Sequence, residues 1–162
     1  MKKIFYLVLF LPCVLSAQEG PLDIFKALEG SVWSAEGKWG DGSSFKQDVS
    51  YEFALNNTLV IAQSMGYTNT EQTEFGPRNH GIRQYDETEK VIRFWEFDVF
   101  GGVTKGIVTS DGKNIIYNYD YGGTALTEIW QYKDDDTYDF TVGIYEDGQW
   151  TQKFLEAQFK RK

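Results

Sequence analysis

Short turn signals recur along the chain after residue 40, and they constrain its fold more than any other feature. They are Gly40-Asp41-Gly42, Asn56-Asn57, Asp86 to Glu89, Gly101-Gly102, Asp111-Gly112, Gly122-Gly123, Asp134 to Asp136 and Asp147-Gly148. Glycine, asparagine and aspartate tolerate the backbone dihedrals of tight turns. The chain is therefore expected to reverse direction often, with only short segments between turns.

Those segments alternate between apolar and polar residues. In residues 45–53 the odd positions are mostly apolar and the even ones polar, which is typical of a half-buried antiparallel strand. We predict ten strands, near 31–39, 44–54, 58–68, 78–85, 90–98, 102–110, 113–121, 125–133, 137–145 and 148–160. The longest connection, 69–77, contains Gly76-Pro77 and is expected to be a mobile loop.

One short helix is expected before the strands, over residues 21–29. Pro21 fits a first helical position, and Leu22, Phe25 and Leu28 recur at helical spacing before Gly30 ends the segment. No later segment is long enough for a helical crossover, so neighbouring strands should pair as antiparallel hairpins.

Ten meandering strands leave two exposed edges unless the sheet closes on itself. A closed barrel and a two-sheet sandwich both answer this problem, and the short, regular connections favour the barrel. The predicted fold class is all-β: a ten-stranded antiparallel up-and-down β-barrel with one short N-terminal helix.

The first residues have the pattern of a secretory signal peptide. A positive start, Met1-Lys2-Lys3, precedes eight apolar residues at 4–11, and the small residues Ser16-Ala17 offer a cleavage site before Gln18. We therefore predict a signal peptide at 1–17, a single barrel domain at 18–162, and export to the periplasm or the medium by a bacterium. The sole cysteine, Cys13, lies in the predicted signal, so the mature domain is expected to have no disulfide or thiol chemistry.

The charge of the domain restricts its partners. Removing Lys2 and Lys3 reduces the 16 basic residues to 14, against 24 acidic ones, which gives a net charge of −10. An acidic domain is a poor partner for nucleic acid or an anionic membrane surface. Aromatic residues make up 17% of the chain, which suits strands, a packed core or the walls of a ligand site.

Several residues give the chain a family likeness. They are Leu28 to Trp33, Gly37, Tyr85-Asp86, Gly106 with Asp111-Gly112, and the terminal Phe159-Lys160-Arg161. In these and in its strand rhythm the chain resembles the calycin superfamily of lipocalin-like barrels, and more narrowly the bacterial lipocalin-like family DUF1579, whose function is unknown. The resemblance implies a small-molecule cavity. It also implies that Gly30, Trp33 and Arg161 close the barrel, with Arg161 packed on Trp33.

Two pairs of neighbouring strands supply candidates for ligand binding. They combine aromatic rings with polar groups, as ligand pockets do, and they are His80, Arg93, Trp95, Glu96, Tyr117, Tyr119 and Trp130. A shift of one residue in register moves each of them to the other face of the sheet, and the sequence does not fix the register. The predicted function is an exported barrel that binds a small, partly apolar molecule.

Two other classes of function remain open. The first is an enzyme that uses His80 with Arg83 or Arg93 and a carboxylate, Glu96 or Asp98, for acid–base chemistry on an organic acid or lipid. The second is a module that binds glycans or another protein through exposed Trp39, Phe100 or Trp150. No cofactor is evident and no metal site is expected, although His80, the only histidine, leaves open a role as haem ligand.

Overall fold

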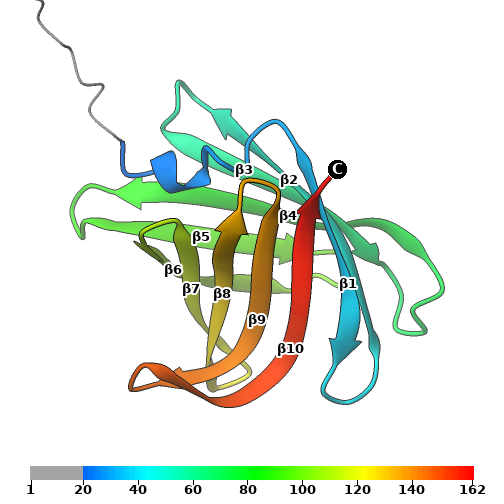
Figure 1. Cartoon of the computed structure of the whole chain (residues 1–162). Helices are drawn as coiled ribbons and strands as arrows, with labels where there is room; N and C mark the ends of the chain where they lie inside the picture. The colour runs from blue at the N-terminus through cyan, green and yellow to red at the C-terminus, as the bar shows by residue number, and fades with distance from the viewer. Residues whose placement is uncertain (1–19) are drawn as a thin grey trace, which may run out of the picture.

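The computed structural model describes residues 20–162, which form one β-barrel (Figure 1). The predicted signal peptide and Cys13 lie outside the described residues. The ten strands are β1 (Val32–Trp39), β2 (Ser44–Ala54), β3 (Leu59–Tyr67), β4 (Phe75–Asp86), β5 (Val91–Asp98), β6 (Val103–Asp111), β7 (Asn114–Tyr121), β8 (Thr124–Asp134), β9 (Thr137–Glu146) and β10 (Gln149–Arg161).

Each strand pairs antiparallel with the next along the chain, and β1 pairs antiparallel with β10. The sheet is therefore closed and has no free edge. This confirms the predicted ten-stranded antiparallel barrel and excludes the two-sheet sandwich. In this topology the β1–β2, β3–β4 and β5–β6 connections lie at the end of the barrel opposite the N-terminal segment.

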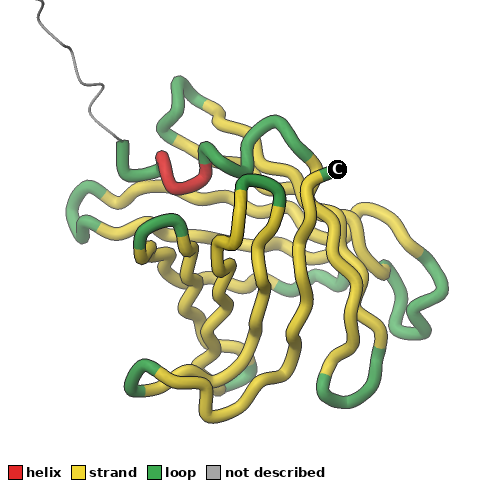
Figure 2. The backbone as a smooth tube through the Cα atoms, viewed as in Figure 1, coloured by secondary structure: helices red, strands yellow, loops and turns green. Residues whose placement is uncertain are grey.

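The helix predicted at 21–29 is wrong in extent and type. The structure has only a three-residue 3-10 helix, η1 (Asp23–Phe25), drawn in red in Figure 2. A segment this short gains too few hydrogen bonds to sustain an α-helix, and apolar residues three apart also match the period of a 3-10 turn. Within the described residues, no helix has the length and apolar character needed to cross a membrane.

The predicted loop at 69–77 is shorter in the structure, because β4 begins at Phe75 rather than residue 78. Gly76 pairs with Gly66, and Pro77 pairs with Met65 just beside a register shift at Ser64. Proline cannot donate a ladder hydrogen bond, and it is tolerated in a sheet at such an irregularity. The β3–β4 hairpin consequently extends beyond the rest of the barrel wall (Figure 1).

Large side chains fill the end of the barrel beside η1. The rings of Trp33 and Tyr138 meet edge to face at 5.3 Å, and Trp130 stacks on Phe159 at 4.2 Å. Phe25, fully buried on η1, adds a further ring that stacks on a tyrosine of β2. Aromatic pairs of these geometries contribute beyond the area that they bury, so these buried rings stabilise this half of the interior.

Arg161 holds the closing strands together. Its guanidinium lies 4.7 Å from the ring centre of Trp33, the residue that it faces across the β1–β10 ladder. The same group donates hydrogen bonds to Ser31 Oγ at 2.8 Å and to the carbonyl oxygen of Ala27 at 3.0 Å. Nearby, Gly30 turns the chain into β1 with φ of +71°, a conformation suited to glycine. The cation–aromatic contact is the one that the resemblance to calycins implied.

Replacing Arg161 with alanine should lower the free energy of unfolding by roughly 2 kcal/mol, because it removes a cation–aromatic contact and charged hydrogen bonds. Urea unfolding followed by tryptophan fluorescence measures the change. Lys160→Ala is the control, because Lys160 is the exposed neighbour on the same strand. Equal stability of the two variants contradicts the closing role of Arg161.

Candidate ligand-binding cavity

A cavity of about 440 Å³, partly open to solvent, occupies the other half of the barrel. Its mouth is formed by Trp39, Ser44, Gln72 and Phe100, which lie at or near the connections opposite η1. Its inner wall includes Tyr51, Arg83, Glu96, Glu128 and Trp130. The volume falls within the range of sites that hold small molecules in proteins.

Small residues on β3 and a group of aromatic rings both line the cavity. Ala62 and Ser64 on β3 are small and leave space beside them. Elsewhere on the wall Phe45 stacks on Phe140 at 6.0 Å, and Phe140 meets Trp130 at 5.5 Å. The cavity therefore combines small side chains on one strand with aromatic rings from other strands.

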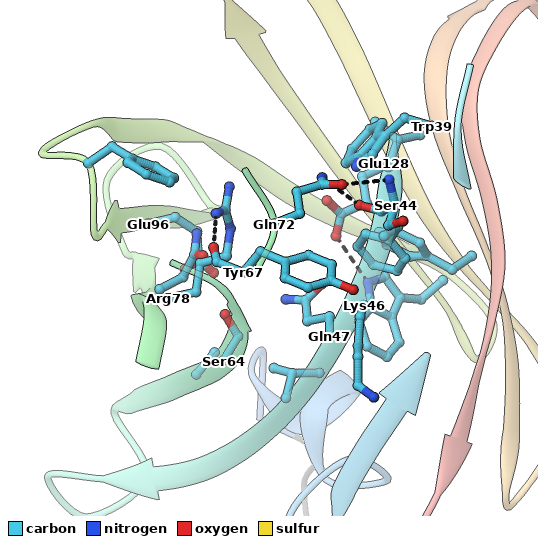
Figure 3. A pocket seen from close by; sticks show the side chains of 18 of the residues that line it. Trp39, Ser44, Lys46, Gln47, Ser64, Tyr67, Gln72, Arg78, Glu96 and Glu128 are labelled. Carbon is cyan, nitrogen blue, oxygen red and sulfur yellow. Dashed lines mark hydrogen bonds between the residues drawn. The ribbon is translucent and has the colours of Figure 1, made fainter. Parts of the chain in front are cut away.

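The β3–β4 loop covers part of the mouth and is fastened to β2 by Gln72. The side-chain amide of Gln72 accepts a hydrogen bond from the backbone N–H of Ser44 and donates one to its carbonyl oxygen, both at 2.8 Å (Figure 3). At the base of the hairpin Arg78 donates to the carbonyl oxygen of Tyr67, and its guanidinium lies 5.0 Å from the ring of Phe100. These contacts fix the rim of the cavity.

A buried ion pair stands at the inner wall. Arg83, only 3% exposed, donates from Nη2 to the carboxylate of Glu96 and from Nε to the hydroxyl of Tyr117 at 3.3 Å. Its guanidinium also lies 5.4 to 5.9 Å from the ring centres of Tyr51, Phe94 and Tyr117. Burial opposes the charge of Arg83, but the neighbouring Tyr117 and Glu96 outweigh it and raise the pKa of Arg83 above its usual range.

Gly81 makes room for this ion pair. A Cβ atom at position 81 would overlap both Arg83 Nη1 and the carboxylate of Glu96. Gly81 faces Glu96 directly across the β4–β5 ladder, and Arg83 is the next residue on the same face of β4. The absence of a side chain at Gly81 is thus what lets both charged groups share the interior.

A second carboxyl group, that of Glu128, enters the cavity from β8. Burial raises the pKa of Glu128 to about 7, and the nearby charge of Glu96 adds to the rise. A hydrogen bond from Trp130 Nε1 at 3.0 Å and the charge of Arg83 act in the opposite direction. Glu128 therefore exchanges a proton near neutral pH, where it can accept or donate a hydrogen bond.

Two buried polar atoms at the cavity have no partner among the described residues. They are Arg83 Nη1 and Ser64 Oγ. A buried donor or acceptor left unpaired costs about 1–3 kcal/mol, so a molecule that reached these side chains and paired with them would recover part of that cost. This combination of orphaned polar groups and aromatic rings is the chemistry of a ligand site.

The structure brings together four of the seven residues predicted from sequence. Glu96, Tyr119 and Trp130 line the cavity, and Tyr117 is buried beside it against Arg83. Burial also raises the pKa of Tyr119, so its hydroxyl stays protonated. These residues come from β5, β7 and β8, which the meander places on neighbouring parts of the wall.

The other three residues lie on the outer face of the barrel. His80 is exposed and faces Phe97 across the ladder, Arg93 forms an ion pair with Asp86 at 2.8 Å, and Trp95 is half-buried. Each is one position out of phase with an interior residue, since Gly81 and Glu96 point inward. His80 and Glu96 therefore do not meet, and the acid–base hypothesis does not hold for this pair.

Two charged residues of the inner wall, Arg83 and Glu128, were missing from the predicted set of ligand-binding residues. Arg83 entered only the enzyme hypothesis. The alternation of the strands gave a weak indication that both residues face inward. Arg83 lies two residues after Gly81, and Glu128 lies two residues before Trp130, so each shares the face of that neighbour. Charged residues on strands usually face solvent, and for that reason these two were not predicted to line the cavity.

The remaining candidates are placed as follows. Trp39 and Phe100 belong to the mouth of the cavity, whereas Trp150 packs against Tyr145 at 4.9 Å in the β9–β10 hairpin. They are not joined in a single patch by any contact between their rings. Within residues 20–162, no group of three or more histidine, cysteine or carboxylate side chains is placed to hold a metal ion.

The closed ten-stranded barrel with its interior cavity is consistent with a calycin-like fold. Comparison with protein-family models gives no match to the chain, and comparison with curated proteins gives none either.

Gly81→Ala should destabilise the protein by roughly 3 kcal/mol, because its methyl group displaces a buried ion pair whose members then lose their contacts. Gly76→Ala on the same strand is the matched control: a Cβ atom there meets only Thr68 Cγ2, at 3.4 Å. Thermal or urea unfolding of both variants gives the comparison. Similar losses of unfolding free energy in the two variants contradict the conclusion that Gly81 makes room for the ion pair.

Glu128→Gln should change how stability depends on pH. The pKa of Glu128 rises from its ordinary 4.5 in the unfolded chain to about 7 on folding, so the folded state holds a proton that the unfolded state releases. This group consequently makes stability fall as pH rises between those two values. Relative to wild type, the glutamine variant should gain about 2 to 3 kcal/mol between pH 5 and pH 8.

Urea unfolding of both proteins at the two pH values tests this expectation. Glu52→Gln is the control, because Glu52 is exposed on β2. A stability difference between the Glu128 variant and wild type that is the same at both pH values contradicts burial of an ionisable Glu128.

Proposed function

We propose that this protein is an exported binding protein that holds a small, partly apolar molecule in the barrel cavity. The observation that carries the proposal is the buried, unpartnered Nη1 of Arg83 at the wall of a cavity of about 440 Å³. Arg83 and Ser64 would bind a polar group of the ligand, and Phe45, Trp130 and Phe140 its apolar part. A barrel with a purely structural interior has no need of such donors.

The family and the location of the protein are parts of the same proposal. The residues that resemble DUF1579 include Trp33 and Arg161, which pack together as such a resemblance implies. Export is supported by the pattern of residues 1–17 in the sequence. Lipocalin-like proteins with a cavity are suited to carrying molecules that dissolve poorly in water, and an exported barrel would meet them outside the cytoplasm.

The test uses N-phenyl-1-naphthylamine, an uncharged aromatic probe that fluoresces in apolar surroundings. It should bind saturably, with a dissociation constant on the order of 10 µM for a ligand of its size, and should receive energy from Trp130. Ser64→Leu should weaken binding by about tenfold, because the larger side chain fills the cavity and removes an orphaned hydroxyl.

Gln63→Leu is the matched control, since it adds the same side chain to the exposed, outer face of β3. Circular dichroism verifies that both variants keep the β-sheet fold. If the probe does not bind saturably, or if Ser64→Leu and Gln63→Leu bind it equally well, the cavity is not a binding site.

A further inference from the structure

The charges around the cavity restrict the class of ligand that can bind there more than the volume of the cavity does. Three side chains inside it carry charge or can acquire it: Arg83, Glu96 and Glu128. Arg83 and Glu96 neutralise each other as an ion pair. The interior is therefore neutral when Glu128 is protonated and has one net negative charge when it is ionised, and in neither state has it positive charge to spare for an anion.

The cations at the mouth lie outside this inner group. Lys46 is paired with Glu36 at 2.7 Å, whereas Arg78 keeps its charge at the mouth, where it donates to the carbonyl oxygen of Tyr67 and lies over the ring of Phe100. A carboxylate, phosphate or sulfate group that reached the inner wall would thus approach Glu96 and Glu128, where the one cation, Arg83, is already paired with Glu96. Like charges so close in a poorly solvated space repel strongly.

A cationic group is unsuited to the part of the wall beside Arg83, because the guanidinium repels it and still has an unpartnered N–H donor at Nη1. That donor requires an acceptor, which an ammonium group does not provide. An uncharged carbonyl oxygen satisfies it. Ser64 Oγ, also unpartnered, offers a second hydrogen bond.

Glu128 supplies a hydrogen-bond acceptor for the ligand, in addition to the donor of Arg83. Its Oε1 accepts from Trp130 Nε1, which leaves the other oxygen of this cavity-lining carboxyl group for a ligand. The ionisable and charged groups around it are Arg83, Glu96 and the tyrosines at positions 51, 117 and 119. An ionised Glu128 favours a ligand that donates a hydroxyl proton, since hydrogen bonds to a carboxylate are stronger than neutral ones.

We propose that the cavity takes an uncharged aromatic molecule that carries both a carbonyl oxygen, bound by Arg83, and a hydroxyl group, bound by Glu128. The aromatic wall of Phe45, Trp130 and Phe140 receives the flat body of this molecule. The inference rests on the proposed function, because it names the class of ligand for the same cavity.

Three naphthalene compounds of matched shape test it: 2-acetyl-6-hydroxynaphthalene, 6-hydroxy-2-naphthoate and 2-acetyl-6-methoxynaphthalene. The first is uncharged and has both groups, the second replaces the ketone by a carboxylate, and the third lacks the hydroxyl donor. Binding of each to the mature wild-type protein is measured by isothermal titration calorimetry at about pH 7.5, where Glu128 is largely ionised. The hydroxyketone should bind about tenfold more tightly than either of the others.

Glu128→Gln should reduce both preferences to within about threefold, because it removes the charge and the strong acceptor. Glu52→Gln removes the same charge from the outer face and should leave both preferences unchanged. Tighter or equal binding of the naphthoate overturns the inference, as does a Glu128→Gln variant that keeps the wild-type preferences.

The failures of the two proposals are distinguishable. If N-phenyl-1-naphthylamine binds in the cavity and the hydroxyketone does not, only the ligand class is wrong. If neither compound binds, both the binding function and the ligand class are overturned.

Discussion

Closure of the sheet between β1 and β10 is the constraint on which the rest of the structure depends. A ten-stranded meander with open edges would present two rows of unpaired backbone groups. Pairing of β1 with β10, in which Trp33 faces Arg161, removes both edges and separates an interior from an exterior. Arginine suits this position because its planar guanidinium lies on the indole ring and still donates to surrounding oxygens. The buried ion pair and the cavity exist only because alternate residues of the ten strands face one enclosed space.

Unequal sizes of side chains divide that space in two. Trp33, Tyr138 and Phe159 fill the end beside η1, whereas the small residues Ala62 and Ser64 line the cavity in the other half. Both lie on β3, and the space over the neighbouring Gly81 on β4 is taken by Arg83 and Glu96. Protein interiors normally pack to the density of organic crystals, so small residues at Ala62 and Ser64 contribute to a cavity of this size.

The sequence was sufficient to predict the rhythm of strands and turns, and with it the closed barrel, because turn residues and alternation are local signals. It was insufficient to predict which face points inward, because a one-residue shift in phase exchanges the two faces. His80 and Glu96 illustrate this limit: both were predicted to bind ligand, yet they lie on opposite sides of the wall. The helix was misjudged for a related reason, since apolar residues spaced by three fit a 3-10 turn as well as a longer helix.

The ion pair of Arg83 and Glu96 is difficult to explain by stability alone. Burying two charges costs desolvation that their attraction barely repays, and apolar residues of similar volume often serve a core as well or better. Here the chain also gives up a side chain at Gly81 to admit the pair, and it leaves one guanidinium nitrogen unpartnered. A second carboxyl group, that of Glu128, with a pKa of about 7, lies nearby. Several departures from the rules of a stable core at one cavity wall are expected where a protein binds a ligand. The features that make this wall costly are therefore the same ones that would make it selective.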